Sequence, residues 1–223
     1  MKIYFTRHGQ VIPSEFMGDE LYQKSDRPLT PLGEEQAVLL GKKLHEIGFR
    51  GKIYSSPFRR ALQTSERIAG ETGSVIVPVG WLHECFTNEE SARTFRGMTI
   101  EQIRERFSHI DPEAELSSPW FAGKCETPEE VASRVAGGIP GVIAKGEDCL
   151  FVGHGASMRG VRVFFGIDHP KGLQTWNCAL SEVEAVEGCF TCLRYLDISF
   201  FPADKVSSNG KLKLQFDAEQ NQQ

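Results

Sequence analysis

The first nine residues, Met1-Lys-Ile-Tyr-Phe-Thr-Arg-His-Gly9, decide how the rest of the chain is interpreted. Residues 3–5 form a short apolar run typical of a β-strand, and that run ends at Arg7-His8-Gly9. A parallel strand in an α/β sheet delivers its last residues to the edge where ligands bind. Arg7 offers donors that match phosphate oxygens, and His8 as a neutral imidazole can attack phosphorus. The same tripeptide fits an ordinary surface strand end equally well, so alone it leaves two alternatives.

Three later segments carry related chemistry. They read Ser55-Ser-Pro-Phe-Arg-Arg-Ala-Leu-Gln-Thr64, Trp81-Leu-His-Glu84 and Val152-Gly-His-Gly-Ala-Ser-Met-Arg159. Together with Arg7-His8-Gly9 they resemble the histidine phosphatase superfamily, the phosphoglycerate-mutase-like enzymes, over roughly residues 1 to 200. The resemblance implies an α/β fold of three layers, α/β/α, with a mostly parallel central sheet.

The resemblance also implies a role for each candidate catalytic residue. These are His8 as nucleophile, Glu84 as general acid and base, and Arg7, Arg60 and His154 as the groups that hold phosphate. Glu84 is selected by the resemblance alone, since other glutamates of the same loop fit equally well. Two adjacent helical arginines differ by about 100° around the axis, so only one can face a pocket, and the resemblance selects Arg60.

The loop from Gln10 to Leu29 departs from the family's pattern. Where the family commonly has a threonine and then an asparagine, this chain has Val11 and no asparagine nearby. Gln10 and Ser14 are candidate substrate-binding residues that could substitute, and the alternative is a polar turn without ligand contact. Gly155, beside the second histidine, joins the substrate-binding set because helix N-terminal amides bind phosphate.

The hydrophobic pattern predicts the remaining elements. Strands are expected at 52–55, 75–79, 149–152, 179–185 and 190–196, with 75–79 at a sheet edge. Helices are expected from Thr30 to Gly48, from a Ser56-Pro57 cap, over 100–107, from Thr127, and over 157–165. Gly137, Gly138 and Pro140 predict a kink or an early end in the helix that begins at Thr127. In the polar tail after Pro202, Leu212, Leu214 and Phe216 alternate as a possible edge strand.

The four main candidate residues each follow a different expected strand. They are His8, Arg60, Glu84 and His154. A parallel sheet would bring all four to one edge although they are far apart in the sequence. This convergence is the strongest argument from the residues for one shared site.

We expect a single domain, 1–223, because nothing like a linker divides the chain. Residues 85–126 do not look like another strand and helix layer, and we expect them to form an insertion or cap over the active site. Within this segment, Arg93 and Arg96 could meet an acidic group of the substrate or be ordinary surface arginines.

The composition limits the class of partner. A net charge of −5 and a pI near 5.7 give no reason to expect nucleic acid or membrane as a partner. No apolar run approaches the ~20 residues of a membrane span, so a cytoplasmic enzyme is the default. Cys189-Phe-Thr-Cys192 is the only Cys-x-x-Cys among six cysteines, and metal and redox roles are not favoured. We expect no cofactor and no metal, since cationic side chains fill the role that a metal would take.

Three hypotheses follow. The first is a metal-independent phosphatase that hydrolyses small phosphorylated metabolites through a phosphohistidine on His8. The second is a phosphoglycerate mutase, disfavoured because the interval from Glu84 to His154 looks too short for the extra segment of such mutases. The third is a non-catalytic phospholigand-binding module, which the departure at Val11 keeps open. Substrate identity and oligomeric state stay undetermined.

Overall fold

The central sheet organises the fold. In the computed structural model, which describes residues 1–17, 24–209 and 211–213, its strand order is β3-β2-β4-β1-β5-β6. The strands are β1 (Lys2–Arg7), β2 (Lys52–Ser55), β3 (Ile76–Pro78), β4 (Cys149–Gly153), β5 (Leu180–Val186) and β6 (Cys189–Asp197). The strands from β3 to β1 in that order are parallel, whereas β5 and β6 are antiparallel. The first strand of the chain therefore lies inside the sheet, between β4 and β5.

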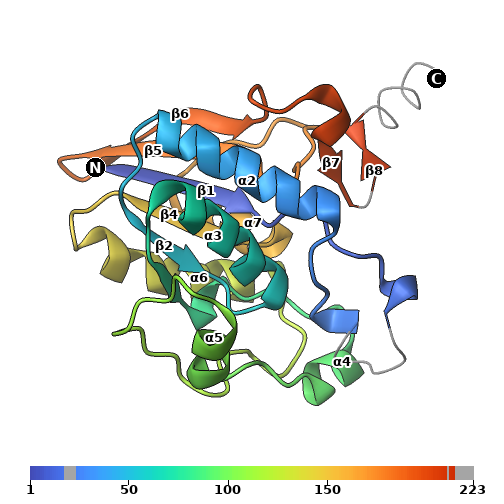
Figure 1. Ribbon diagram of the computed structural model, residues 1–223. Helices are drawn as coiled ribbons and strands as arrows, with labels where there is room; N and C mark the ends of the chain where they lie inside the picture. Colours follow the sequence, from blue (N-terminus) through green and yellow to red (C-terminus); the bar gives the residue numbers. More distant parts are fainter. Residues whose placement is uncertain (18–23, 210, 214–223) are drawn as a thin grey trace.

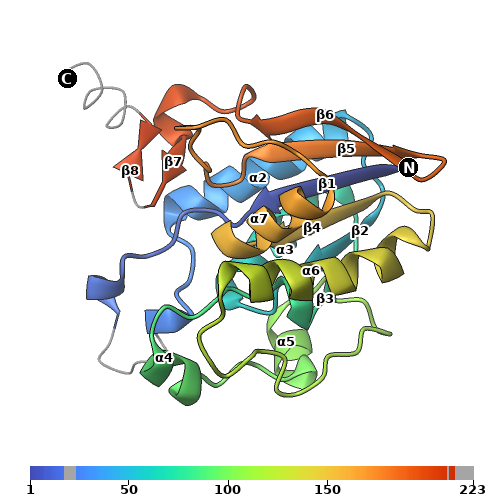
Figure 2. The same cartoon turned by 180° about the vertical axis from the view of Figure 1, so that it is seen from behind.

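Helices cover both faces of this sheet, as the expected three-layer α/β/α fold requires. On one face lie α2 (Pro31–Glu46) and α3 (Arg59–Thr72), and on the other lie α6 (Pro128–Ile143) and α7 (Gly155–Phe164) (Figures 1 and 2). The shorter helices are η1 (Ser14–Phe16), η2 (Gly80–Leu82), α4 (Glu89–Thr94), α5 (Ile100–Arg106) and η3 (Ala203–Lys205). The strands β7 (Ser207–Ser208) and β8 (Lys211–Leu212) pair with each other outside the main sheet.

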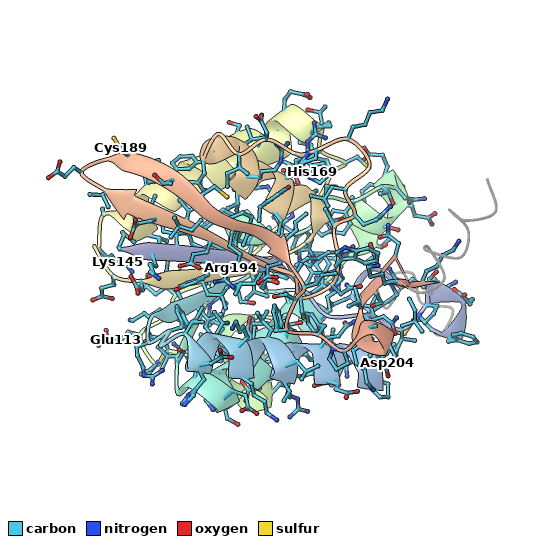
Figure 3. All side chains as sticks on the ribbon, turned by 90° about the horizontal axis from the view of Figure 1, so that it is seen from above. Glu113, Lys145, His169, Cys189, Arg194 and Asp204 are labelled. Carbon is cyan, nitrogen blue, oxygen red and sulfur yellow. The ribbon has the colours of Figure 1, made fainter. Side chains whose placement is uncertain are left out.

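Alternation along the strands separates two apolar cores. Tyr4 and Ile53 pack with the buried faces of α2 and α3, while Ile3 and Phe5 pack with those of α6 and α7. All four side chains are almost completely buried, and each such burial contributes about 1.5–3 kcal/mol. Figure 3 shows the side chains filling the layers, with Cys189 at the end of the β5–β6 hairpin. Because side chains of β1 pack into both cores, the C-terminal end of this strand is held in a fixed position.

The start of α3 differs from the expected Ser56-Pro57 cap. The helix begins at Arg59 with Phe58 at the N-cap position and no side-chain cap from that residue. Instead, Asp26 from the loop after β1 accepts a hydrogen bond from the Arg59 amide at 2.7 Å. The predicted Ser56-Pro57 cap was wrong because the Asp26 carboxylate, which is distant in the sequence, occupies the position that a local serine would fill.

Of the kink or early end expected in α6, the early end was wrong. The helix begins after the expected capping box at Thr127 and continues through Pro140 to Ile143. Val135, Ile139 and Val142 keep their helical spacing and are buried against the sheet, so packing outweighs the cost of a proline inside the helix.

The structure differs from two further expectations, at α4 and in the tail. The helix α4 was not expected, although the Asn88 side chain caps it by accepting from the Ser91 amide at 2.9 Å. In the tail, Leu212 lies in β8 and not at the edge of the main sheet, and Leu214 and Phe216 lie outside the described residues. Within the described part of the chain, no helix is long and apolar enough to cross a membrane.

Candidate active site

The four residues expected to converge do meet at the carboxyl edge of the parallel strands. His8 and His154 follow the neighbouring strands β1 and β4, and their ring centroids are 5.2 Å apart. Arg60 lies in the first turn of α3, and its Nε is 3.2 Å from His8 Nε2. Glu84 follows β3 and η2, and its Oε2 is 4.0 Å from His154 Nδ1. The parallel strand order is what brings these distant residues together.

Two contacts fix where His8 carries its proton. Its Nδ1 is 2.7 Å from the carbonyl oxygen of Gly9, which can only accept, so Nδ1 is protonated. Its Nε2 faces the Arg60 Nε–H, which can only donate, so Nε2 presents a lone pair. Burial first, then the charges of Arg60 and Arg7, hold the pKa of His8 well below 6.5. The result is a neutral imidazole whose nucleophilic nitrogen faces a guanidinium.

His154 is fully buried and leaves one ring nitrogen unsatisfied. Its Nε2 lies 2.8 Å from Ser56 Oγ, while its Nδ1 has no hydrogen-bond partner among the described residues. Burial, then the charges of Arg60 and His8, lowers the pKa of His154 well below 6.5. Buried polar atoms are rarely left unpaired, so this nitrogen marks a position where a ligand oxygen fits.

Arg7 is tethered by two of its three nitrogens. Its Nη1 donates to the Thr175 carbonyl at 3.1 Å, and its Nη2 donates to Asn209 Oδ1 at 3.1 Å. Its Nε is buried and has no partner among the described residues. Burial lowers the pKa of Arg7, and the carboxylate of Glu84 opposes that shift. The tether fixes the orientation of the guanidinium and leaves its buried Nε–H as a donor for a ligand.

Two cavities lie at the site, and His8 lines the first of them. The first, of about 470 Å³, is lined by His8, Arg7, Gln10, Val11 and Asn177 among others. The second, of about 520 Å³, is lined by Arg60, Glu84, Phe58, Phe86, Thr87 and Ser91 among others. Both sizes suit a small-molecule ligand. Ser14 lines both cavities, so it sits where they meet.

The other expected binding residues lie less centrally. Gln10 lines the first cavity, but its Oε1 accepts from Thr30 Oγ1 at 2.9 Å and so supports the start of α2. Gly155 begins α7 and lines a third cavity of about 470 Å³, which shares Arg7 with the first. Arg93 and Arg96 do not line any of these three cavities, and Arg96 Nη1 donates to nearby carbonyls.

Sequence reasoning missed two residues of the site. Arg27 lines both cavities, and Asn177 lines the first and donates from Nδ2 to the His8 carbonyl at 2.8 Å. Asn177 is itself held by Ser207, whose hydroxyl donates to Asn177 Oδ1 at 3.1 Å. Neither residue stands in a motif; the only signal for Arg27 was its place in the loop that follows His8.

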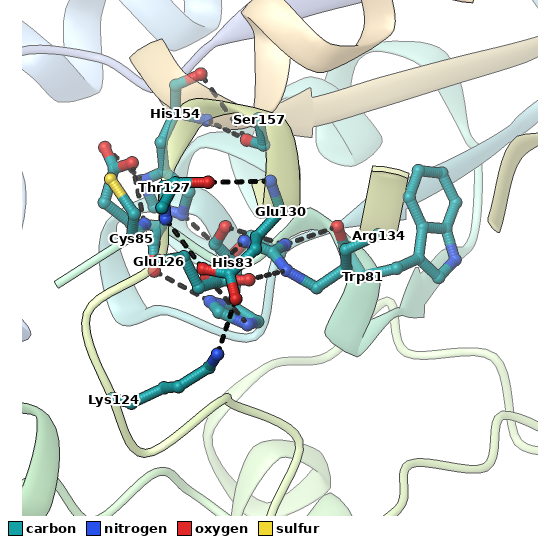
Figure 4. Close-up of polar contacts among 12 residues, drawn as sticks. Trp81, His83, Cys85, Lys124, Glu126, Thr127, Glu130, Arg134, His154 and Ser157 are labelled. Atoms are coloured by element: carbon teal, nitrogen blue, oxygen red, sulfur yellow. Dashed lines mark hydrogen bonds and ion pairs between the residues drawn. The ribbon is translucent and has the colours of Figure 1, made fainter. Parts of the chain in front are cut away.

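A partly buried ion pair holds the segment that carries Glu84. Arg134 of α6 binds both carboxylate oxygens of Glu126 at 2.7 Å and donates to the carbonyls of Trp81 and His83 at 2.7 and 3.2 Å (Figure 4). The Glu84 carbonyl in turn lies 2.7 Å from His83 Nδ1. These contacts fix the backbone that positions the Glu84 carboxylate. We refer to Glu126, Arg134 and their backbone partners as the clamp.

Comparison with known proteins identifies the family. A model of the histidine phosphatase superfamily (branch 1) matches residues 3–198. The chain belongs to this superfamily. A protein named probable phosphoglycerate mutase GpmB, from Escherichia coli O1:K1 / APEC, is 26% identical over 194 residues, covering 84% of this chain and 86% of that protein.

Solved structures share the fold of this chain. The ecdysone phosphate phosphatase from Bombix mori, solved with tungstate, superposes with a TM-score of 0.67 at 18% identity and covers 96% of this chain and 98% of its own. A mycobacterial glucosyl-3-phosphoglycerate phosphatase, solved with inorganic phosphate, gives a TM-score of 0.60 at 18% identity, with 90% and 99% covered. At these identities the likeness establishes the fold.

Proposed function

We propose that the protein is a metal-independent phosphatase that hydrolyses small phosphomonoesters through a phosphohistidine on His8. One observation carries this proposal: a buried, neutral His8 presents the lone pair of Nε2 beside the Arg60 guanidinium, at 3.2 Å. A neutral nitrogen is the form that attacks phosphorus, and the adjacent cation stabilises the charge of the transferring group.

The proposed reaction has two displacements. The lone pair of His8 Nε2 attacks phosphorus, the P–O ester bond breaks, and the leaving alkoxide takes a proton from the Glu84 carboxyl group. The Glu84 carboxylate then takes a proton from water, whose oxygen attacks phosphorus as the P–N bond breaks. Arg7, Arg60 and His154 hold the phosphoryl oxygens in both steps. Inorganic phosphate leaves, and His8 regains its lone pair.

We also propose a place for the leaving group. Cys85, Phe86, Thr87 and Ser91, at the start of segment 85–126, line the cavity that contains Glu84, so this segment would cover the alcohol part of the ester. Gln10, Ser14 and the amide of Gly155 would add further contacts. All six cysteines are free thiols, which fits the proposed cytoplasmic location.

The test is phosphate release from a panel of phosphomonoesters in the presence of a chelator. We expect turnover by the wild type, loss of turnover in His8→Ala, and retention in His45→Ala, a matched change of an exposed histidine on α2. Rapid quenching should trap a label on His8 that is stable in base and labile in acid. Phosphate release that persists in His8→Ala would refute the proposal.

The mutase hypothesis has one supporting observation, the relatives named probable phosphoglycerate mutase. It requires interconversion of 2- and 3-phosphoglycerate with little free phosphate. Tight binding of phosphate esters with no turnover in either assay would instead favour the binding module.

A further inference from the structure

Arg27 is a cation of the site that the proposed chemistry does not use. It lines both cavities of the site, and among the described residues only Ser14 does so as well. Arg27 shares the first cavity with His8 and Arg7 and the second with Arg60, and its charge is a smaller cause of the lowered pKa of all three. A third guanidinium beside the phosphoryl position exceeds what a single phosphate dianion needs.

Among the described residues, no carboxylate forms an ion pair with Arg27. Burial lowers its pKa, and among the described residues its guanidinium donates one hydrogen bond, from Nη1 to the Ile12 carbonyl at 3.2 Å. Glu15 lines the first cavity and raises the pKa of Arg27, but no ion pair within 4.0 Å joins these two side chains. A half-buried cation that no carboxylate of the described residues pairs with is an arrangement that suits an anionic ligand group.

The backbone on both sides of Arg27 is anchored. Asp26 accepts from the Arg59 amide at 2.7 Å, and the Pro28 carbonyl accepts from the Ile12 amide at 3.0 Å. The Leu29 amide donates to Gln63 Oε1 at 3.0 Å. Arg27 is thus presented from a segment fixed to α3 and to the start of the loop, which reduces the ordering cost of binding.

The second cavity shows which part of a substrate Arg27 would meet. It holds Glu84, the proposed proton donor to the leaving group, and one of its walls carries Phe58 and Phe86. Lys24 lines the same cavity, so two cations face the space beyond the reacting phosphate. Arg93 and Arg96, the candidates from the sequence for an acidic group, do not line it.

We propose that Arg27 is a specificity-determining residue that binds a second anionic group on the leaving alcohol. The preferred substrates are then phosphomonoesters whose alcohol carries a carboxylate or a further phosphate. This inference rests on the proposed phosphatase function.

The experiment compares two substrates that differ in this group alone. Glycerol 3-phosphate and 3-phosphoglycerate share the phosphate and the carbon chain, and the second has a carboxylate in place of a hydroxymethyl group. We expect kcat/KM for 3-phosphoglycerate to fall about 10- to 100-fold in Arg27→Gln, the loss of one charge-assisted hydrogen bond, with glycerol 3-phosphate changed less than about 3-fold. Arg27→Lys should recover part of the loss.

Arg93→Gln is the matched control, because it removes an arginine from segment 85–126 that does not line the cavities, and it should leave both substrates unchanged. Equal losses for both substrates in Arg27→Gln would overturn the inference and assign Arg27 to the reacting phosphate. No loss for either would also overturn it. A wild type that releases phosphate from neither substrate, nor from the wider panel, would instead refute the proposed function.

Discussion

The Arg60 guanidinium has two effects on His8, because its Nε lies 3.2 Å from His8 Nε2. As a donor it holds Nε2 in the lone-pair form, and as a charge it is the second cause, after burial, of the low pKa of His8. Its own pKa falls to about 10, chiefly by burial, so it stays cationic in the neutral range. Protonation of His8 would place two cations in contact, and this arrangement therefore keeps His8, the proposed nucleophile, neutral at mildly acidic pH.

Replacing Arg60 by glutamine should separate these two effects. Loss of a donor to the transferring group should lower kcat/KM by about 10²- to 10³-fold. Loss of the positive charge favours the imidazolium form, so the pKa of His8 should rise and the acid limb of the pH profile of kcat/KM should move to higher pH. Arg59→Gln, which changes the exposed neighbour, should alter neither quantity. An acid limb that stays in place or moves to lower pH would contradict this account of His8.

At the scale of elements, two connections between distant segments hold the site together. Asp26 binds the first amide of α3, and the clamp fixes the segment that carries Glu84. Asp26 supplies an acceptor to the Arg59 amide, which has no partner within its own helix. Arg134 supplies donors to the carbonyls of Trp81 and His83.

The Asp26 contact should be measurable as stability of α3. Asp26→Ala removes the acceptor for the Arg59 amide and should reduce the free energy of unfolding by about 0.5–2 kcal/mol. Asp26→Asn retains a side-chain oxygen and should lose much less. Urea denaturation of the two variants measures the difference, and equal losses would show that the hydrogen bond is not the stabilising feature.

The clamp predicts a coupling between the charges of Arg134 and Glu126. In Arg134→Met, the Glu126 carboxylate is left buried without its partner, and we expect a loss of about 3–5 kcal/mol in the free energy of unfolding. Adding Glu126→Gln removes that charge and should restore part of the loss. Additive losses in the double variant would contradict the coupling.

The double variant also tests whether the clamp positions Glu84. If it does, kcat/KM should fall more for an alkyl phosphate, whose leaving group needs a proton, than for 4-nitrophenyl phosphate, whose leaving group does not. A purely structural role would lower both by the same factor.

At the scale of the whole molecule, the buried histidines link stability to pH. Burial is the first cause of the low pKa of His8, of His154 and of His83. The pKa of His83 falls to about 4. In the unfolded chain each takes up a proton near pH 6.5, so below that pH the unfolded state binds more protons. Stability should therefore fall as pH falls through about 6.5, by up to about 1.4 kcal/mol per pH unit for each histidine.

Urea denaturation between about pH 7.5 and 5.5 measures this slope. His83→Gln removes one of the three groups, and its slope should be about a third smaller. A free energy of unfolding that does not change over this range would contradict the prediction.

The sequence predicted those parts of the molecule that depend on local pattern. The strands before His8 and His154, the Thr30 cap of α2 and the capping boxes at Thr99 and Thr127 all follow from neighbouring residues, and the structure confirms them. Convergence at one edge followed from a parallel sheet, without any knowledge of side-chain contacts.

The rest depends on contacts between distant segments, which local pattern does not encode. Asp26 at the start of α3, Asn209 on Arg7, and Arg27 between the cavities all reach the site from loops or the tail. The continuation of α6 through Pro140 likewise depends on packing against the sheet.

The position of β1 inside the sheet has a consequence for evolution. The His8 amide donates to the Gly153 carbonyl at 3.0 Å, so His8, the proposed nucleophile, belongs to the most cooperative part of the fold, and its amide should exchange with solvent only on global unfolding. Arg27 and the residues at the start of segment 85–126 that line the second cavity lie outside the six strands of the sheet, so substitutions of their side chains affect it less. Mutation can therefore change the range of substrates while the chemistry at His8 is preserved.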